Sequence, residues 1–135
     1  MKRICLFGLM ACFLFCIPLS ADAAQPVPVE ILYMNHGPLQ PTLKEINKLC
    51  AAYGDKITVS RYDFESPEGE LFMNRKGIKQ HVPLVIWMNG KSTFSLKGKE
   101  ISFVGFPSGS GPAFFQGKWT IDDLRKALDQ LTRKK

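Results

Sequence analysis

Residues 82–90 read Val-Pro-Leu-Val-Ile-Trp-Met-Asn-Gly, and this stretch constrains the fold more than any other. Its centre, Leu84 to Met88, is an uninterrupted apolar run, which is typical of a strand buried on both faces. Asn89 and Gly90 form the pair that most strongly predicts a two-residue hairpin turn. The stretch therefore predicts a buried strand followed by an antiparallel return.

Upstream, the sequence predicts a strand–helix–strand unit. Val29 to Met34 is a nearly continuous apolar run, and Ile57 to Phe64 is rich in β-branched and aromatic residues. A helix after Pro38, ending near Gly54, is predicted from apolar residues at helical spacing: Leu43, Ile46, Cys50 and Tyr53. Because such units join parallel strands by a right-handed crossover, we expect the two strands to be parallel.

A second helix is predicted to begin with Ser66 as N-cap and Pro67 in its first turn, to bury Leu71 and Phe72, and to end before Gly77. Beyond Gly90, both Thr93 to Leu96 and Ile101 to Val104 qualify as strands, so one or two strands follow the turn. The last helix has Thr120 as N-cap, Asp123 as its capping-box partner and Trp119 stapled onto Leu124. Its expected buried face is Ile121, Leu124, Leu128 and Leu131.

The N-terminus predicts export. Lys2 and Arg3 precede an apolar run from Ile4 to Leu19 and a small-residue stretch, which is the pattern of a secretory signal peptide covering residues 1–24. The run is too short for a membrane span, so we expect a periplasmic or secreted protein without stable membrane insertion. A lipid anchor at Cys12 is the minor alternative, and it would leave an apolar stretch on the mature protein. Cleavage removes three of the four cysteines and leaves Cys50 unable to form an internal disulfide.

The chain carries 18 basic and 12 acidic residues, and the basic ones are scattered through residues 25–135. Nucleic-acid binding usually needs a basic stripe with interleaved aromatics, so no nucleic-acid partner is predicted. The excess of positive charge fits a solvated surface or attraction to a membrane surface better. The glycines of residues 105–119 lack the Gly-Lys-Ser/Thr ending of a phosphate loop, and no cofactor is predicted.

Residues 36–39 read His-Gly-Pro-Leu after the first predicted strand, and Val82-Pro83 precedes the third. These two motifs resemble those of the thioredoxin-like superfamily, whose members carry Cys-Gly-Pro-Cys in the place of residues 36–39. The following residues resemble the family's Pro-x-Leu-x-Glu-Ile helix face: Pro41, Leu43, Glu45 and Ile46. Val82-Pro83 stands before the third strand, where the family has a cis-proline loop that holds extended peptides by backbone hydrogen bonds. The resemblance spans Val27 to Arg133 and implies a three-layer α/β/α sandwich with a mixed sheet, in the order β-α-β-α-β-β-α, over residues 25–135.

The resemblance also implies the loss of dithiol chemistry, because His36 and Leu39 occupy the two cysteine positions. Thiol–disulfide exchange needs an activated thiolate there and a resolving cysteine one turn away. Cys50 is expected on the buried face of the first helix, as a core residue. A single-cysteine oxidoreductase working through Cys50 remains the enzymatic alternative.

Residues 105–119 combine glycines with four large aromatics, in a connection longer than the family usually has. Two interpretations carry equal weight: a loop folded over the core, or an exposed apolar patch for a partner. If the resemblance holds, this loop lies beside the helix start and the Val82-Pro83 loop. The expected groove consists of His36, Gly37, Pro38, His81, Val82, Pro83, Phe106, Phe114 and Phe115.

The sequence thus predicts a redox-inactive exported accessory protein that binds a protein or an extended peptide in this groove. His36 and His81, the two histidines of the chain, are expected on one face. With Met34 or Met88 nearby they are weak candidates for copper ligands, and local polar roles are the favoured interpretation.

Overall fold

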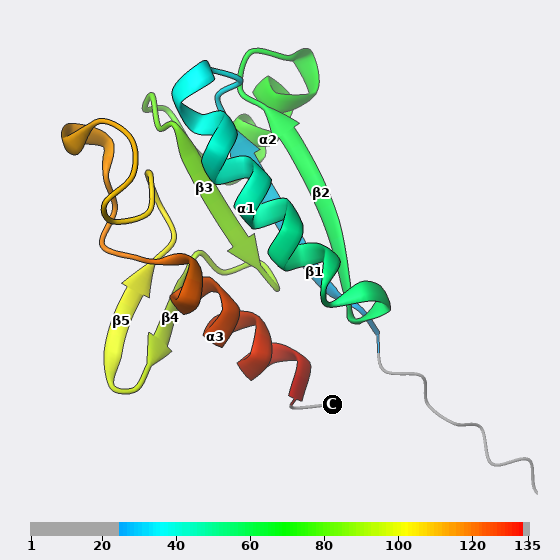
Figure 1. The fold of residues 1–135 in the computed structure, drawn as a ribbon. Helices are drawn as coiled ribbons and strands as arrows, with labels where there is room; N and C mark the ends of the chain where they lie inside the picture. The colour runs from blue at the N-terminus through cyan, green and yellow to red at the C-terminus, as the bar shows by residue number, and fades with distance from the viewer. Residues whose placement is uncertain (1–24, 134–135) are drawn as a thin grey trace, which may run out of the picture.

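The computed structural model describes residues 25–133, so the predicted signal peptide, residues 1–24, lies outside the described part of the chain. Three strands form a mixed sheet in the order β2-β1-β3: β1 is Val27–Tyr33, β2 is Ile57–Asp63 and β3 is Leu84–Met88. β1 runs parallel to β2 and antiparallel to β3 (Figure 1). The predicted parallel strand–helix–strand unit and the predicted mixed sheet are both confirmed.

Three helices cover the sheet: α1 is Gln40–Ala51, α2 is Pro67–Lys76 and α3 is Ile121–Arg133. Short 3-10 turns stand at η1 (Gly37–Leu39), η2 (Gly54–Lys56) and η3 (Ala113–Phe115). The predicted caps are present. Ser66 Oγ accepts a hydrogen bond from Gly69 N at 3.0 Å, and Thr120 and Asp123 exchange the two bonds of a capping box.

Strand alternation divides the apolar side chains into two layers. Leu84, Ile86 and Met88 of β3 join the larger core with α1 and α3, whereas Val85 and Trp87 join a smaller core with Phe72 of α2. Successive strand residues point to opposite faces, so the unbroken apolar run of β3 serves both cores. The helices therefore lie on both faces of the sheet, α1 and α3 in front and α2 behind in Figure 1.

The hairpin turn after β3 is present, but its return does not form one long strand. Asn89 and Gly90 have φ values of 49° and 76°, as a two-residue turn requires, and Met88 pairs with Lys91. The chain then leaves the sheet as a separate antiparallel hairpin, β4 (Thr93–Leu96) with β5 (Lys99–Ser102). Phe103 and Gly105 return to bond the free edge of β3, at Ile86 and Leu84. Two strands thus follow Gly90.

The predicted order β-α-β-α-β-β-α is present, with β5 as one further strand between β4 and α3, and two local details are corrected. Leu71 was predicted to be buried, but its side chain is 65% exposed, because the face of α2 that packs against the smaller core carries Phe72 and Met73 instead. The second predicted strand after the turn, Ile101 to Val104, begins earlier, at Lys99, and ends at Ser102. Within residues 25–133, no helix has the length and apolar character needed to span a membrane.

Candidate functional site

An apolar cavity of about 80 Å³ lies at the end of the sheet where β1 finishes and β3 begins. We call it the proline groove. It is lined by Met34, His36, Pro38, Leu39, Pro83, Phe106, Pro112 and Phe115. These residues come from three stretches that are far apart in sequence: the end of β1 with η1, the loop before β3, and the long loop 105–119 that contains η3.

The groove contains five of the nine residues expected from the sequence: His36, Pro38, Pro83, Phe106 and Phe115. Sequence reasoning missed three lining residues, Met34, Leu39 and Pro112. Met34 and Leu39 are buried apolar residues next to predicted site residues, and that adjacency was the available signal. The remaining four predicted residues, Gly37, His81, Val82 and Phe114, do not line the cavity.

Backbone hydrogen bonds fix the walls of the groove. Met34 N donates to Pro83 O at 2.9 Å, which joins the end of β1 to the loop before β3. Leu39 N donates to His36 O at 3.0 Å and closes the η1 turn. On the opposite wall, Phe106 N donates to Phe115 O at 2.9 Å. The lining is therefore largely formed before any ligand binds.

The loop before Pro83 offers unused backbone donors. Ile78 N is bonded to Met73 O at 2.9 Å, but the N–H groups of residues 79–82 have no partner in the described part of the chain. Val82 is half-buried and packs its side chain against the smaller core. No cis peptide occurs within residues 25–133, so the Val82–Pro83 bond, whose isomer the sequence leaves open, has the ordinary trans form.

The long loop, residues 105–119, is partly folded over the core and partly exposed, so each of the two interpretations holds for different residues. Phe106 and Trp119 are buried in the larger core, and Trp119 Nε1 donates to Gly105 O at 3.2 Å. Phe115 is half-buried at the groove, whereas the Phe114 side chain is 81% exposed and lies against the Phe115 ring, with centroids 4.4 Å apart. The loop therefore folds onto the core and still presents aromatic surface beside the groove.

The two histidines both contact the turn that follows β2. His36 Nε2 lies 3.2 Å from Glu65 Oε1, and the His81 ring packs edge-on against Phe64 at 4.9 Å. Both side chains are exposed. Residues 25–133 contain no group of three or more His, Cys, Asp and Glu side chains close enough to hold a metal ion. Copper binding by the histidines therefore stays a prediction that rests on the sequence.

Cys50 is a buried free thiol on α1, as predicted. Burial raises the pKa of the thiol above its usual value, and the positive charge of Arg61 offsets part of that rise. A raised pKa leaves little thiolate at neutral pH, and the thiolate is the reactive form. Cys50 does not line the groove.

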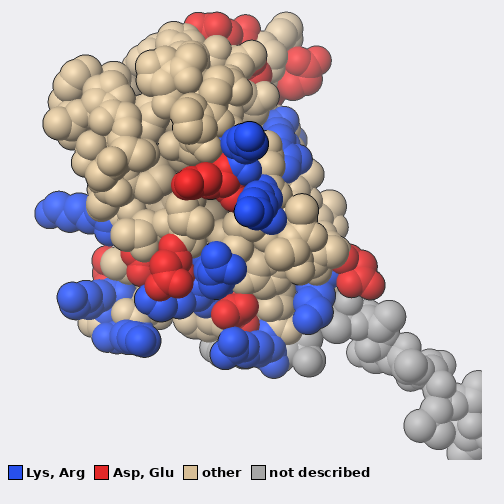
Figure 2. Space-filling view, in the orientation of Figure 1, with Lys and Arg blue, Asp and Glu red and all other residues tan. Residues whose placement is uncertain are grey.

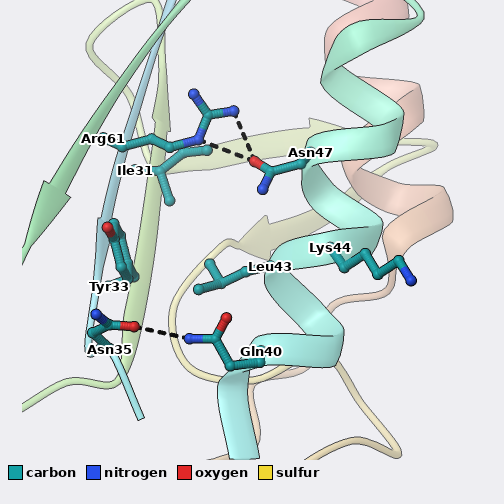
Figure 3. Close-up of a pocket in the computed structure, with 8 residues that line it drawn as sticks. All are labelled: Ile31, Tyr33, Asn35, Gln40, Leu43, Lys44, Asn47 and Arg61. Atoms are coloured by element: carbon teal, nitrogen blue, oxygen red, sulfur yellow. Dashed lines mark hydrogen bonds between the residues drawn. The ribbon is translucent and has the colours of Figure 1, made fainter. Parts of the chain in front are cut away.

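A second cavity, of about 310 Å³, lies between α1 and the sheet, and no sequence motif predicted it. We call it the Arg61 cavity. Figure 3 shows Tyr33 and Asn35 on one side and Gln40, Leu43 and Asn47 of α1 on the other, with Ile31 behind and Arg61 above. Gln40 Nε2 donates to Asn35 Oδ1 at 2.9 Å, and Arg61 donates twice to Asn47 Oδ1. Lys44, also at this cavity, extends away from it (Figure 3).

Charge is distributed unevenly over the face shown in Figure 2. Lys and Arg gather toward the end that carries the hairpin β4–β5 and the C-terminal end of α3, whereas the end with η1 and the long loop is mostly uncharged. The proline groove opens in that uncharged region, since its lining residues belong to η1 and to the long loop. No protein-family model matches this chain, and a search of curated proteins gives no match either.

Proposed function

We propose that this chain is an exported accessory protein of thioredoxin-like fold that holds an extended segment of a partner protein in the proline groove, without dithiol chemistry. The observation that carries the proposal is the groove itself. It brings residues 36–39, Pro83 and the aromatic loop to one apolar cavity beside unused backbone donors.

The strand order β2-β1-β3 supports the thioredoxin-like assignment. In this order a parallel pair precedes an antiparallel strand, and η1 stands between β1 and α1, where the family carries its dithiol. Pro83 immediately precedes β3, as the family's conserved loop does. Fold alone does not imply activity, so the function rests on the groove and not on the fold.

The chemistry of the groove suits an extended peptide. The lining is apolar apart from His36, and a proline or aromatic side chain of a ligand would be desolvated there. The N–H groups of His81 and Val82 can donate to the carbonyls of an extended backbone, which gives affinity independent of sequence. Exposed Phe114 adds an aromatic contact at the rim.

Dithiol exchange is not part of the proposal, because neither place that the family uses for cysteine holds one. His36 and Leu39 stand there, and Leu39 is buried. The thiol of Cys50 is also buried and has a raised pKa. The groove is therefore proposed as a binding surface only, whereas members of the thioredoxin-like superfamily combine binding with redox chemistry at this place.

Peptide selection tests the binding role. Random peptides displayed on phage are selected on the purified protein, and the dissociation constants of the synthesised winners are measured by fluorescence anisotropy. We expect Phe115→Ala and Pro38→Ala to weaken binding, the former about tenfold or more, because an aromatic in a desolvated pocket is a typical hot spot.

Leu71→Ala is the matched control, because it truncates another exposed apolar side chain on the opposite side of the sheet. Its affinity should equal that of the wild type, and thermal unfolding verifies that each variant is folded. Selected peptides that bind the groove variants and the wild type equally well would overturn the assignment of the groove.

A further inference from the structure

The outer edge of β2 is a strand edge without a partner in the described part of the chain, because β2 is the terminal strand of the sheet. The direction of its backbone groups follows from one bond: Phe64 N donates to Tyr33 O, toward β1. Direction alternates along a strand, so Val59 and Arg61 point their N–H and C=O groups outward. Asp63 also points outward, but its carbonyl already accepts from Ser66.

Arg61 adds a charge to this edge. Its Nε and Nη2 donate to Asn47 Oδ1 at 3.0 and 2.7 Å, which fixes the plane of the guanidinium. The remaining N–H groups have no partner, and Arg61 forms no ion pair within residues 25–133. An arginine held in place by an amide and free of carboxylates is preorganised to bind one.

The Arg61 cavity lies on the same face as the Val59 and Arg61 side chains. Both face α1, since Val59 packs against the larger core and Arg61 reaches Asn47. In an added strand, the residues on this face would alternate with residues on the α2 face. A side chain opposite Val59 or Arg61 would therefore lie at the mouth of the cavity, next to the guanidinium.

From these placements we propose that the edge of β2 is a second binding site, which takes an extended protein segment by strand addition and prefers an acidic side chain beside Arg61. Backbone bonds to Val59 and Arg61 supply affinity, and the Arg61 guanidinium supplies the preference for a carboxylate. The site is separate from the proline groove: none of the residues lining the groove belongs to β2.

The test uses two end-blocked peptides of alternating threonine and valine, one with glutamate at its centre and one with lysine. Each is titrated into the isotope-labelled protein and followed by two-dimensional NMR. We expect the amide signals of Val59 and Arg61 to shift and their hydrogen exchange to slow. The glutamate peptide should bind about tenfold more tightly than the lysine peptide, as a charge-assisted pair allows.

Two variants and one control separate the contribution of the Arg61 charge from that of the backbone hydrogen bonds. Arg61→Gln should remove the preference for glutamate, whereas Lys48→Gln, which deletes the same charge from the exposed face of α1, should leave it unchanged. Val59→Pro removes an outward N–H and should abolish binding, and far-UV circular dichroism reports whether that variant folds.

Equal affinity for the two peptides would overturn the proposal, as would equal effects of Arg61→Gln and Lys48→Gln. So would binding that shifts the amides around Phe115 and leaves those of Val59 and Arg61 unmoved. That last result would show that the peptide binds in the proline groove, and the proposed function of the groove would still stand.

Discussion

Leu39 and His36 stand in the two positions where the proposed thioredoxin-like fold would carry its cysteines, and neither side chain has a thiol. Leu39 is buried and forms part of the groove wall, whereas His36 is exposed and paired with Glu65. A cysteine pair in these two places would need one reactive sulfur at the surface. The present residues instead contribute an apolar wall and a polar rim.

Cys50 is predicted to be inert. A water-soluble thiol reagent should label it more than about a hundredfold more slowly in the native protein than in denaturant, because burial blocks access and raises the pKa of the thiol. The rate of labelling is followed by mass spectrometry. Native labelling as fast as that of the denatured chain would instead support the single-cysteine oxidoreductase.

Close contacts between backbone atoms hold the long loop, residues 105–119, against the neighbouring chain. A Cβ on Gly117 would lie 2.1 Å from Val104 O, and a Cβ on Gly105 would lie 2.4 Å from Phe115 O. The loop therefore packs directly against the strand residues beside β3. This contact presents Phe106 and Phe115 to the groove.

Gly117→Ala is expected to lower the free energy of unfolding by about 1–3 kcal/mol, because the added methyl group overpacks a backbone contact. Gly37→Ala is the matched control, since nothing lies within 4 Å of the corresponding Cβ, and its effect should stay within about 0.5 kcal/mol. Urea unfolding measures both values. Equal stabilities would mean that the loop does not pack as described.

Tyr53 connects the end of α1 to α3 and predicts a dependence on pH. Its hydroxyl donates to Asp129 Oδ1 at 2.8 Å, and burial together with this bond raises the pKa of Tyr53 to about 12. The unfolded tyrosine ionises near pH 10, so the folded state holds its proton longer and its stabilising effect is lost as pH rises from about 10 to about 12.

Tyr53→Phe should cost about 1 kcal/mol near pH 9, where the tyrosine is neutral in both states. The difference between wild type and variant should shrink near pH 11. Urea unfolding at the two pH values measures it, and a difference that stays constant would contradict the raised pKa.

For the whole molecule, much of the fold follows from local patterns in the sequence. The apolar run of β3 predicted burial on both faces, and Thr120 with Asp123 predicted the start of α3, because each pattern acts over a few residues. The groove was predicted in part, since the resemblance put residues 36–38 beside Pro83. The exposure of Leu71 was not predicted, because Leu71 and Phe72 are both apolar and adjacent in sequence. Only tertiary packing determines which of the two side chains is buried.

The Arg61 cavity could not be found from the sequence for a different physical reason. Its polar residues come from β1, α1 and β2 and share no spacing, and only tertiary packing brings Asn47 and Arg61 together. The separation of β4 and β5 from the main sheet is also determined by tertiary packing. The pairing of β4 with β5 has a local signal in the Lys97-Gly98 turn, with φ values of 51° and 78°, but their separation from β3 depends on tertiary packing.

We propose that this molecule keeps a peptide-binding groove in the place where members of the thioredoxin-like superfamily combine binding with dithiol chemistry. The insulin-reduction assay is the sharpest test of this proposal: purified protein is added to insulin and dithiothreitol, and the precipitation of reduced insulin chains is timed. We predict a rate equal to that of the reaction without protein, since residues 36–39 contain no cysteine and Cys50 is buried. Turnover comparable to that of a true thioredoxin would overturn the proposed absence of dithiol chemistry.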